Sequence, residues 1–352
     1  MFFSKSKSIV GLDIGSSAIK LVELKEKKAG TFQLVKAGLE PLSPEAIVDG
    51  SIMDSSMVVD TIQRLNTTLG VKNSNYGTSL SGHSVIIKKI SLPAMSADEL
   101  DESIQWEAEQ YIPFDINDVN LDYVPLTAPG AGENIEVILV AVKKEKINDY
   151  TSVIGQAGKA AALVDVDAFA VQNCYEMNYP GDAAKVVALV NIGASVTNVN
   201  ILSDGSSLFW RDITFGGNQY TDAIQRELNL SFAQAEGLKR GEPAGDHTLQ
   251  QVIPILNSVS EDFASELRKT LDFFTATSGA DRVDSIILSG GGASALNLET
   301  ILKDKFGIEV EIMNPFKNIS FNEGDFNPEW ISEVAPSMAV AVGLAIRKVG
   351  DA

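Results

Sequence analysis

The sequence has 352 residues, and at about 150 residues per domain this length suggests two domains. Hydrophobic residues make up 45% of it, which is enough for a substantial core. With 28 basic and 47 acidic residues the net charge is −19, which disfavours a nucleic-acid partner and direct docking on anionic lipid. Cys174 is the only cysteine and there are two histidines, so an intramolecular disulfide is excluded and no zinc-type cluster can be assembled.

The first 80 residues are predicted to form strands followed by a helix. Residues 8–24 read as two apolar strands joined by a tight turn, and residues 31–40 as a third strand. Residues 55–69 have helical spacing, with Ile62 and Leu65 on one side. This order indicates a mixed α/β unit.

Residues 80–160 are predicted to form a compact α+β unit of their own. A strand over residues 84–92 stops at Pro93, and Ser96 and Glu99 then form a capping box that opens a helix. Two more strands are expected near residues 117–124 and 134–142. After this unit, strand-like and helical segments alternate to the end, which indicates an α/β architecture with a smaller insert.

A weak internal repeat relates the two halves of the chain. Residues 9–24 (IVGLDIGSSAIKLVEL) align without a gap with residues 187–202 (VALVNIGASVTNVNIL). Each copy has an apolar strand, a polar residue, Ile-Gly, small residues and a second strand. The identical positions are Ile14 and Ile192, Gly15 and Gly193, Ser17 and Ser195, and Leu24 and Leu202. The pattern predicts two related lobes that face one another.

The tips of these two hairpins have the chemistry of an anion site. Glycine and small residues leave backbone N–H groups uncovered, and consecutive N–H groups bind anions. We expect Gly15 and Gly193 to supply the backbone freedom, so that two opposed hairpins grip a polyphosphate from both sides. Asp13 could hold Mg²⁺ through water, and Lys20 could reach a phosphate. The alternative is a pair of ordinary tight hairpins.

A third glycine cluster follows the predicted strand 285–288. Gly290, Gly291 and Gly292 stand between that strand and a helix, where a flat ring or a phosphate can approach the backbone closely. The spacing fits neither the dinucleotide fingerprint nor the P-loop.

Taken in order, these elements resemble the nucleotide-binding set of the actin/Hsp70/sugar-kinase superfamily. The set is GLDIGSSAIK at 11–20, the repeat at 188–202, the glycine cluster at 287–294 and VAPSMAVAVGLAIR at 334–347. A narrower resemblance, over essentially the whole chain, is to the actin-like PilM family of type IV pilus assembly proteins, which is related to the division protein FtsA. It is carried by FGG at 215–217, AEGLK at 235–239, ISLP at 90–93 and EAEQYIPF at 107–114.

The resemblance implies an α/β, actin-like two-lobed fold of duplicated RNase H-like domains, with an FtsA-like subdomain inserted in the first lobe. The first lobe is then expected to comprise residues 1–79 and 161–187, completed by a C-terminal helix at 335–352. The insert is expected at 80–160 and the second lobe at 188–334.

The resemblance also implies roles for individual residues. The first phosphate loop would be Asp13, Gly15, Ser16, Ser17 and Lys20, with Mg²⁺ bound to Asp13 through water. The second phosphate loop would contain Asn191, Gly193, Ala194 and Ser195, with Gly217 nearby. Glu236 and Lys239 would contact ribose and adenine, and Gly290, Gly291 and Gly292 would form the adenosine loop.

ATP and Mg²⁺ are the cofactors that this resemblance implies, and the cytoplasmic N-terminal peptide of the membrane protein PilN is the partner, together with other components of the pilus machinery. The protein is then expected in the cytoplasm, at the inner face of the inner membrane, with membrane association only through its partner. The sequence fits this, because the longest apolar runs, Val186–Val190 and Met338–Ile346, fall short of the roughly 18 residues of a membrane span, and no signal peptide is apparent.

Asn191 departs from the superfamily pattern, which usually has an aspartate in the second phosphate loop. An amide cannot act as a general base, and such help is worth roughly 10²–10⁴ in rate. We therefore expect ATP binding with weak or absent hydrolysis, and no catalytic residue is assigned. Asp165 or Asp167, where a strand ends before a helix, is a candidate to lie near the site, and Asp167 could cap that helix.

The insert combines acidic and aromatic residues. Eight acids and no Lys or Arg lie between residues 98 and 118, which is typical of a solvated helix face. Trp106, Tyr111, Ile112 and Phe114 could be core, or could line an apolar groove for a peptide. Position by position the core is favoured, whereas the resemblance favours a groove for the PilN peptide.

Two other functions stay open. A phosphotransferase of the sugar-kinase type would need a base and a polar substrate pocket, and neither can be assigned. A filament-forming ATPase remains possible because self-association surfaces have no sharp sequence signature.

Overall fold

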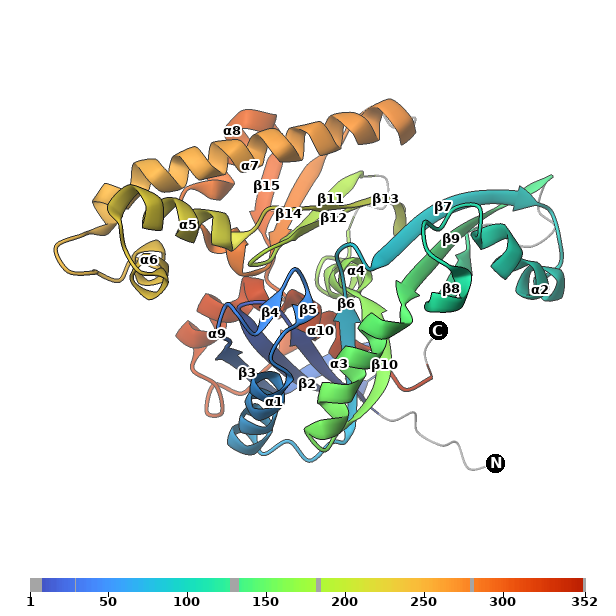
Figure 1. Ribbon diagram of the computed structural model, residues 1–352, viewed down its shortest axis with the longest axis horizontal. Coiled ribbons are helices and arrows are strands. Elements are labelled where there is room, and N and C mark those ends of the chain that lie inside the picture. The colour runs from blue at the N-terminus through green and yellow to red at the C-terminus, as the bar shows by residue number, and fades with distance from the viewer. Residues whose placement is uncertain (1–7, 29, 127–132, 182–184, 279–281, 351–352) are drawn as a thin grey trace.

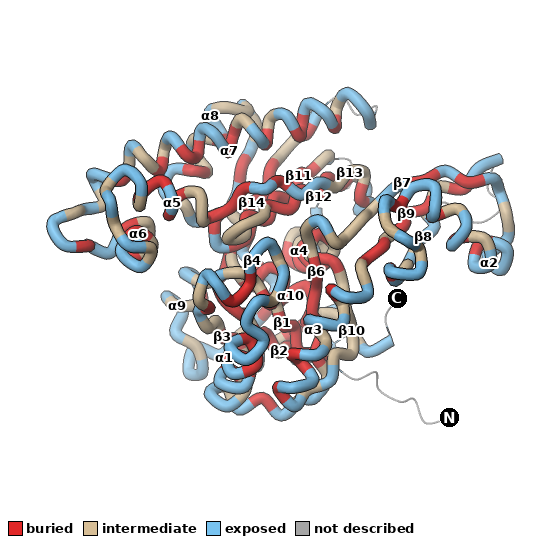
Figure 2. The backbone as a smooth tube through the Cα atoms, in the orientation of Figure 1, coloured by how far each residue is buried: buried red, intermediate tan, exposed pale blue. Residues whose placement is uncertain are grey.

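The chain folds around two main β-sheets with a smaller unit at one side (Figure 1). The computed structural model describes residues 8–28, 30–126, 133–181, 185–278 and 282–350. Buried residues concentrate in the strands of both sheets and in the helices between them (Figure 2).

The first sheet has six strands in the order β10-β6-β1-β2-β3-β16. β1, β2 and β3 form an antiparallel meander, whereas β6 and β10 run parallel to β1. The strands are β1 (Val10–Ile14), β2 (Ala18–Lys28), β3 (Thr31–Pro41), β6 (Asn75–Leu80), β10 (Ala160–Val166) and β16 (Ile319–Ser320). Because β1, β6 and β10 are parallel, their carboxyl ends meet at one edge of the sheet.

Two helices cover one face of this sheet, α1 (Ser55–Leu69) and α3 (Lys144–Gln156). The Asp54 side chain caps α1 by accepting a hydrogen bond from the Met57 backbone N–H at 2.9 Å. α1 ends at Gly70, which has φ 61 and a left-handed backbone. The helix therefore has the bounds that its apolar spacing predicts. A short hairpin, β4 (Ile47–Val48) and β5 (Ser51–Ile52), precedes it.

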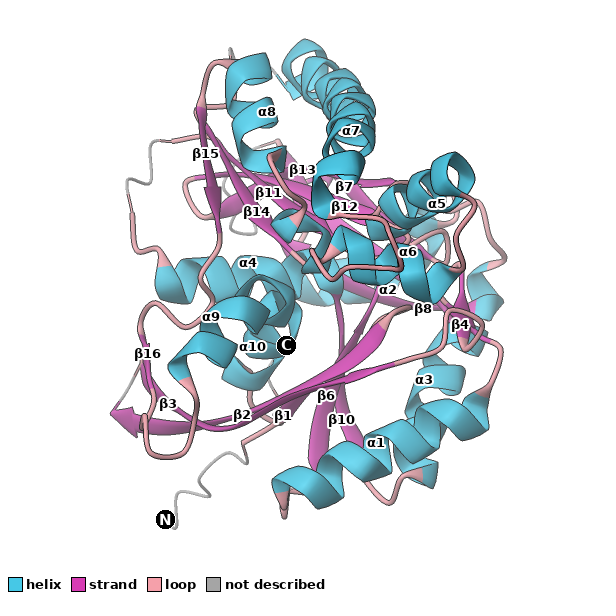
Figure 3. Ribbon diagram, turned by 90° about the vertical axis from the view of Figure 1, so that its left-hand side faces the viewer, coloured by secondary structure: helices cyan, strands magenta, loops and turns pink. Residues whose placement is uncertain are grey.

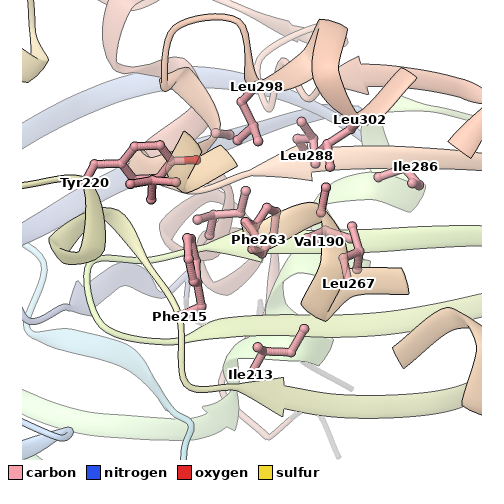
Figure 4. Packing of buried hydrophobic residues seen from close by; sticks show 14 of the residues in the cluster. Val190, Ile213, Phe215, Tyr220, Phe263, Leu267, Ile286, Leu288, Leu298 and Leu302 are labelled. Atoms are coloured by element: carbon pink, nitrogen blue, oxygen red, sulfur yellow. The ribbon is translucent and has the colours of Figure 1, made fainter. Parts of the chain in front are cut away.

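The second sheet has five strands in the order β13-β12-β11-β14-β15. Its strands are β11 (Val187–Ile192), β12 (Thr197–Ser203), β13 (Ser206–Ile213), β14 (Ser285–Ser289) and β15 (Glu309–Ile312). The helices that cover it are α5 (Gly217–Leu228), α6 (Phe232–Lys239), α7 (Leu249–Ser278) and α8 (Leu298–Phe306). Their shared core includes Phe215, Phe263 and Leu288, all of which are buried (Figure 4).

The helices α4 (Asp167–Asn178) and α10 (Ala339–Ile346) lie between the two sheets (Figure 3). They pack closely because glycines remove the side chains at the crossings. A Cβ on Gly343 would lie 1.7 Å from the Ala170 carbonyl oxygen, and one on Gly11 would lie 1.9 Å from the Ala341 carbonyl oxygen. The C-terminal helix α10 therefore packs closely against both β1 and α4.

The segment Pro328–Ile346 is long and apolar enough to cross a membrane, which corrects the expectation that no run reaches that length. It comprises α9 (Pro328–Val334), the 3₁₀ turn Ala335–Met338 and α10. In the structure 61% of the segment is buried, and its side chains belong to the core between the sheets. Its apolar character is that of a core helix.

The projecting unit has its own sheet and core. β7 (Val85–Pro93), β9 (Asn134–Lys143) and β8 (Val119–Pro125) pair in that order, and α2 (Ala97–Ala108) packs on them. The predicted capping box is present, since the Ser96 backbone N–H donates to the Glu99 carboxylate at 2.8 Å. A 3₁₀ turn, Ile116–Asp118, leads into β8.

The packing differs from the expected domain boundaries in two places. α3 falls within the predicted insert 80–160, but Tyr150 and Ile154 belong to the core of the first sheet. β16 and α9 fall within the predicted second lobe 188–334, but β16 pairs with β3, and Ile331 lies in the core between the sheets. Both segments bury apolar side chains that their predicted lobe would leave exposed. The division as a whole stays a prediction.

Candidate functional site

The β1–β2 hairpin has its tip at the carboxyl edge of the first sheet. Asp13 pairs across the strands with Lys20, and the Gly15 N–H closes the turn by donating to the Ala18 carbonyl at 3.1 Å. The Asp13 carboxylate and the Lys20 ammonium form an ion pair at 3.0 Å, and each side chain is only about 15% exposed. Lys20 is therefore held at the base of the turn.

The β11–β12 hairpin repeats this geometry. Gly193 N–H donates to the Val196 carbonyl at 3.0 Å, as Gly15 does in the first hairpin. Asn191 pairs across the strands with Asn198, so an amide pair stands where the first hairpin has the Asp13–Lys20 ion pair. The sequence repeat is thus a structural repeat in the same register. Neither Gly15 nor Gly193 has a positive φ, which corrects the expectation that these glycines supply unusual backbone freedom.

Four amides at the two tips are left open. In the part of the chain that the structure describes, the backbone N–H groups of Ser16, Ser17, Ala194 and Ser195 have no protein acceptor. Backbone N–H groups gathered in this way bind anions. The two tips come from different sheets and have the same turn, so each offers an anion the same kind of cradle.

The first residues of α5 are hydrogen-bonded to the second hairpin. Gly217 N–H donates to the Gly193 carbonyl and Asn218 N–H donates to the Ala194 carbonyl, both at 2.8 Å. A Cβ on Gly216 would lie 2.5 Å from the Ala194 carbonyl oxygen, so only glycine allows this approach. The predicted residues of the second loop and Gly217 therefore lie together.

Glu236 and Lys239 join the same assembly from α6. Their side chains form an ion pair at 2.6 Å, and the Lys239 ammonium also donates to the Gly217 carbonyl at 3.2 Å. Thr221 of α5 donates to the Glu236 carboxylate at 2.6 Å. Gly217 is itself hydrogen-bonded to Gly193, so these two predicted nucleotide contacts are linked to the second hairpin through Gly217.

The third glycine cluster packs against the second hairpin as well. Gly290 has φ 85, and a Cβ there would lie 2.3 Å from the Ile192 carbonyl oxygen. A Cβ on Gly292 would lie 2.3 Å from the Ile192 side chain, whereas one on Gly291 would meet nothing within 4 Å. Gly290 and Gly292 are therefore needed for packing, and Gly291 is the one of the three that leaves open space above the backbone.

Asn191 belongs to a buried chain of polar side chains. Its Oδ1 accepts from the Ser289 hydroxyl and its Nδ2 donates to the Asn198 Oδ1, both at 3.2 Å. Asn198 in turn donates to the Asp212 carboxylate at 2.8 Å. Both polar atoms of Asn191 are thus used, and only a group with one donor and one acceptor satisfies both neighbours.

Asp167, one of the two acidic candidates from the sequence, lies near enough to the first hairpin for the charge of Asp13 to act on it. It is the first residue of α4, and its carboxylate accepts from the Ser79 hydroxyl at 2.5 Å. It forms no cap hydrogen bond, so the expected capping role is wrong. Burial, and next the negative charge of Asp13, raise the pKa of Asp167 to about 6. Asp165 lies apart from it, in an ion pair with Arg347 at 3.0 Å.

No three acidic, histidine or cysteine side chains of the described residues converge as a metal site. Mg²⁺ differs from the metals held by such clusters, because it keeps most of its water and takes only one or two carboxylates. Asp13 and Asp167 are the carboxylates whose charges act on one another at this edge.

The four residues predicted to line a groove are split by the structure. Trp106 is 73% exposed and Tyr111 39%. Ile112 is buried in the core of the insert, which corrects its assignment to the groove. Phe114 packs partly against that core, with the Lys143 ammonium 4.4 Å from its ring centre. Ile112 directly follows the last turn of α2, where its backbone N–H donates to the Ala108 carbonyl at 3.1 Å.

A hollow of about 440 Å³ lies between Gln105 of α2 and the start of β8. Sequence reasoning missed its lining because these residues are mostly polar and give no apolar pattern. Its walls are Gln105, Ile116, Asn117, Val119, Asn120, Leu121 and Lys144. Part of the wall is the start of β8, which is an edge strand of the insert sheet. An edge strand has free N–H and C=O groups that can pair with an extended peptide.

Comparison with known proteins identifies related chains. Residues 11–349 match the family described as type IV pilus assembly protein PilM. The structure is similar to that of a PilM-PilN type IV pilus biogenesis complex, with a TM-score of 0.88 and 30% identity over 99% of this chain and 100% of that one.

More distant structures share the fold alone. The ethanolamine utilization protein EutJ of Carboxydothermus hydrogenoformans has a TM-score of 0.59 and 15% identity, over 97% of this chain and 90% of its own. MreB5 of Spiroplasma citri bound to AMPPNP has a TM-score of 0.53 and 12% identity, over 97% of this chain and 96% of its own. The actin-like two-lobed α/β fold predicted from the sequence is confirmed.

Proposed function

Because the chain belongs to the PilM family of type IV pilus assembly proteins, we propose that it is an ATP-binding adaptor that binds the cytoplasmic N-terminal peptide of PilN and links it to the pilus machinery. The related solved structure is a PilM-PilN complex that this chain matches over 99% of its length. The adaptor would lie in the cytoplasm and would associate with the inner membrane through its partner.

The observation that supports nucleotide binding is the pair of open hairpin tips. Four backbone N–H groups, on Ser16, Ser17, Ala194 and Ser195, have no acceptor among the described residues. A triphosphate placed between the tips would satisfy them from both lobes. Glu236 and Lys239 would then lie on the side of the base and sugar, next to Gly217.

Asp13 and Asp167 would hold Mg²⁺ through its water shell. When bound, the cation would neutralise phosphate charge. Asp13 is kept in place by Lys20, and Asp167 by the Ser79 hydroxyl. Asn191 cannot serve as a base, since both of its polar atoms are engaged by neighbours. We therefore propose ATP binding with slow or absent hydrolysis, which disfavours a phosphotransferase.

The peptide site would be the hollow beside α2 and β8. Trp106, the residue after Gln105 of the lining, offers an exposed apolar surface, and β8 offers an edge for main-chain pairing. Asp98, Asp101 and Glu102, on the exposed part of α2, give this region a negative charge. A peptide from the cytoplasmic flank of a membrane protein, where Lys and Arg are enriched, has the complementary charge.

Two calorimetric titrations test the proposal. Purified protein is titrated with Mg-ATP, and separately with a synthetic peptide of the PilN cytoplasmic N-terminus, with a scrambled peptide as control. Saturable binding of both ligands at one site each is expected, with no binding of the scrambled peptide. Absence of ATP binding would refute the nucleotide part, and absence of peptide binding would refute the adaptor part.

A further inference from the structure

Lys146 is a buried lysine in the first turn of α3, with only 6% of its surface exposed. Its ammonium donates to the Gly50 carbonyl, at the turn between β4 and β5. It forms no ion pair with a carboxylate in the part of the chain that the structure describes. Nothing in the sequence pattern distinguishes Lys146 from the other lysines, so only the structure reveals its burial.

A buried ammonium without a counter-ion is costly, because a carbonyl replaces only part of its hydration. Burial accordingly lowers the pKa of Lys146. Two other lysines, at the proposed nucleotide site, are compensated: Lys20 pairs with Asp13 at 3.0 Å and Lys239 pairs with Glu236 at 2.6 Å. Lys146 therefore carries a buried positive charge that no ion pair in the described structure neutralises.

Lys146 lies at the carboxyl edge of the first sheet, where the phosphates of a bound nucleotide would lie. α3 leads directly into β10, and it runs back along the sheet, so its first turn stands at the carboxyl ends of β1, β6 and β10 (Figure 1). One turn further on, Tyr150 packs in the same core cluster as Ile14, which stands between Asp13 and Gly15 of the first phosphate loop. The charge of Asp167 acts on both Lys146 and Tyr150.

Gly50 does not depend on Lys146 alone. The Tyr150 hydroxyl donates to the same carbonyl at 3.0 Å. Lys146 can therefore leave this acceptor while Tyr150 keeps the β4–β5 turn attached to α3. A lysine has a flexible four-carbon stem, so its ammonium can move to a new anion without a backbone change.

We propose that Lys146 is a phosphate-binding residue of the nucleotide site. In the free protein its ammonium donates to the Gly50 carbonyl, and a bound nucleoside triphosphate then becomes its counter-ion. The inference rests on the proposed nucleotide-binding function and adds to it a residue that discriminates nucleotides by their phosphate charge. Lys146 then favours ATP over ADP, and both over AMP.

The test compares Lys146→Met with Tyr150→Phe in calorimetric titrations with Mg-ATP, Mg-ADP and AMP. Methionine keeps the apolar stem of lysine and removes its charge. One charge-assisted hydrogen bond corresponds to about tenfold or more in affinity. We expect Lys146→Met to weaken ATP binding at least about tenfold and AMP binding less than about threefold. Tyr150→Phe, which removes the other donor to Gly50, should leave the ATP to AMP affinity ratio of the wild type unchanged.

The outcomes separate this inference from the function on which it rests. An equal loss of affinity for all three nucleotides, no loss, or the same profile in Tyr150→Phe would show that Lys146 only fastens the β4–β5 turn, and would overturn the inference. Thermal unfolding of each free variant shows whether it is folded. Wild-type protein that binds none of the three nucleotides would instead refute the nucleotide site itself, and this inference with it.

Discussion

Asn191 shows how one residue sets both packing and chemistry. Its cross-strand pair with Asn198 replaces the Asp13–Lys20 pair of the first hairpin, and its amide satisfies Ser289 as well. A carboxylate at this position would lack the donor that Asn198 requires. The residue that removes a general base from the site is thus the one that completes a buried hydrogen-bond chain.

Asn191→Asp is therefore predicted to be less stable but more active in hydrolysis. The lost donor leaves a buried acceptor unsatisfied, which costs about 1–3 kcal/mol in the free energy of unfolding. A restored carboxylate beside the second phosphate loop should raise ATP turnover at least about tenfold, within the range for a general base. Urea unfolding and phosphate release measure the two effects. Unchanged stability would contradict the hydrogen-bond chain, and unchanged turnover would contradict the explanation of slow hydrolysis.

Asp167 gives a prediction with a defined pH window. Its pKa is raised to about 6, mainly by burial and then by the charge of Asp13, so the folded protein binds this proton more tightly than the unfolded chain does. The stability that the proton contributes is fully present below the unfolded pKa of about 4, and it is lost as the pH rises through about 6.

Asp167→Asn removes this titration and keeps an oxygen that can accept from Ser79. The free energy of unfolding of the variant, minus that of the wild type, should rise by about 2–3 kcal/mol between about pH 4 and pH 7. Urea unfolding at several pH values measures the difference. The matched control is Asp262→Asn, on the exposed side of α7, where a flat difference is expected. A flat difference for Asp167→Asn would refute the shifted pKa.

At the scale of single elements, the third glycine cluster separates packing from ligand access. Gly290 has φ 85 and no room for a Cβ, whereas Gly291 has neither restriction. Three neighbouring glycines in the sequence look equivalent, and only the approach of Ile192 distinguishes them.

Gly290→Ala should therefore lower the free energy of unfolding by more than about 3 kcal/mol, because strain and a backbone clash combine. Gly291→Ala should change it by less than about 1 kcal/mol. Denaturant unfolding followed by circular dichroism gives both values. Similar effects in the two variants would mean that the second hairpin and β14 are not packed as described.

Two residues of the insert, one exposed and one buried, allow a matched test of the proposed peptide site. Trp106 is 73% exposed and Ile112 is buried in the insert core. Trp106→Ala should weaken binding of the PilN peptide at least about tenfold, as for an aromatic anchor, with the unfolding temperature nearly unchanged. Ile112→Ala should lower stability by about 2–5 kcal/mol through a core cavity. Trp106→Ala that binds the peptide normally would place the peptide elsewhere.

At the scale of the whole molecule, local patterns predicted most elements. The α1 helix, the capping box at Ser96 and the two repeated hairpins follow from spacing and turn chemistry within a few residues, and the structure confirms them. The internal repeat predicted two related lobes, and the family resemblance supplied their actin-like fold, which no local pattern can specify.

What the sequence could not predict depends on contacts between distant segments. Ile112 belongs to an aromatic-rich run, yet it is buried in the core of the insert. α3 packs on the first sheet because its apolar side meets β6 and β10, which lie on either side of the insert in the chain. Lys146 gains its significance only because β4–β5, nearly 100 residues earlier, covers it.

The central claim is that two hairpins from opposite lobes hold one triphosphate, and a crystal structure of this protein with Mg-AMPPNP tests it most directly. We expect phosphate oxygens within hydrogen-bond distance of the backbone N–H groups of Ser16 or Ser17 in one lobe and of Ala194 or Ser195 in the other. Phosphates that contact only one hairpin, or a nucleotide bound away from both, would contradict it.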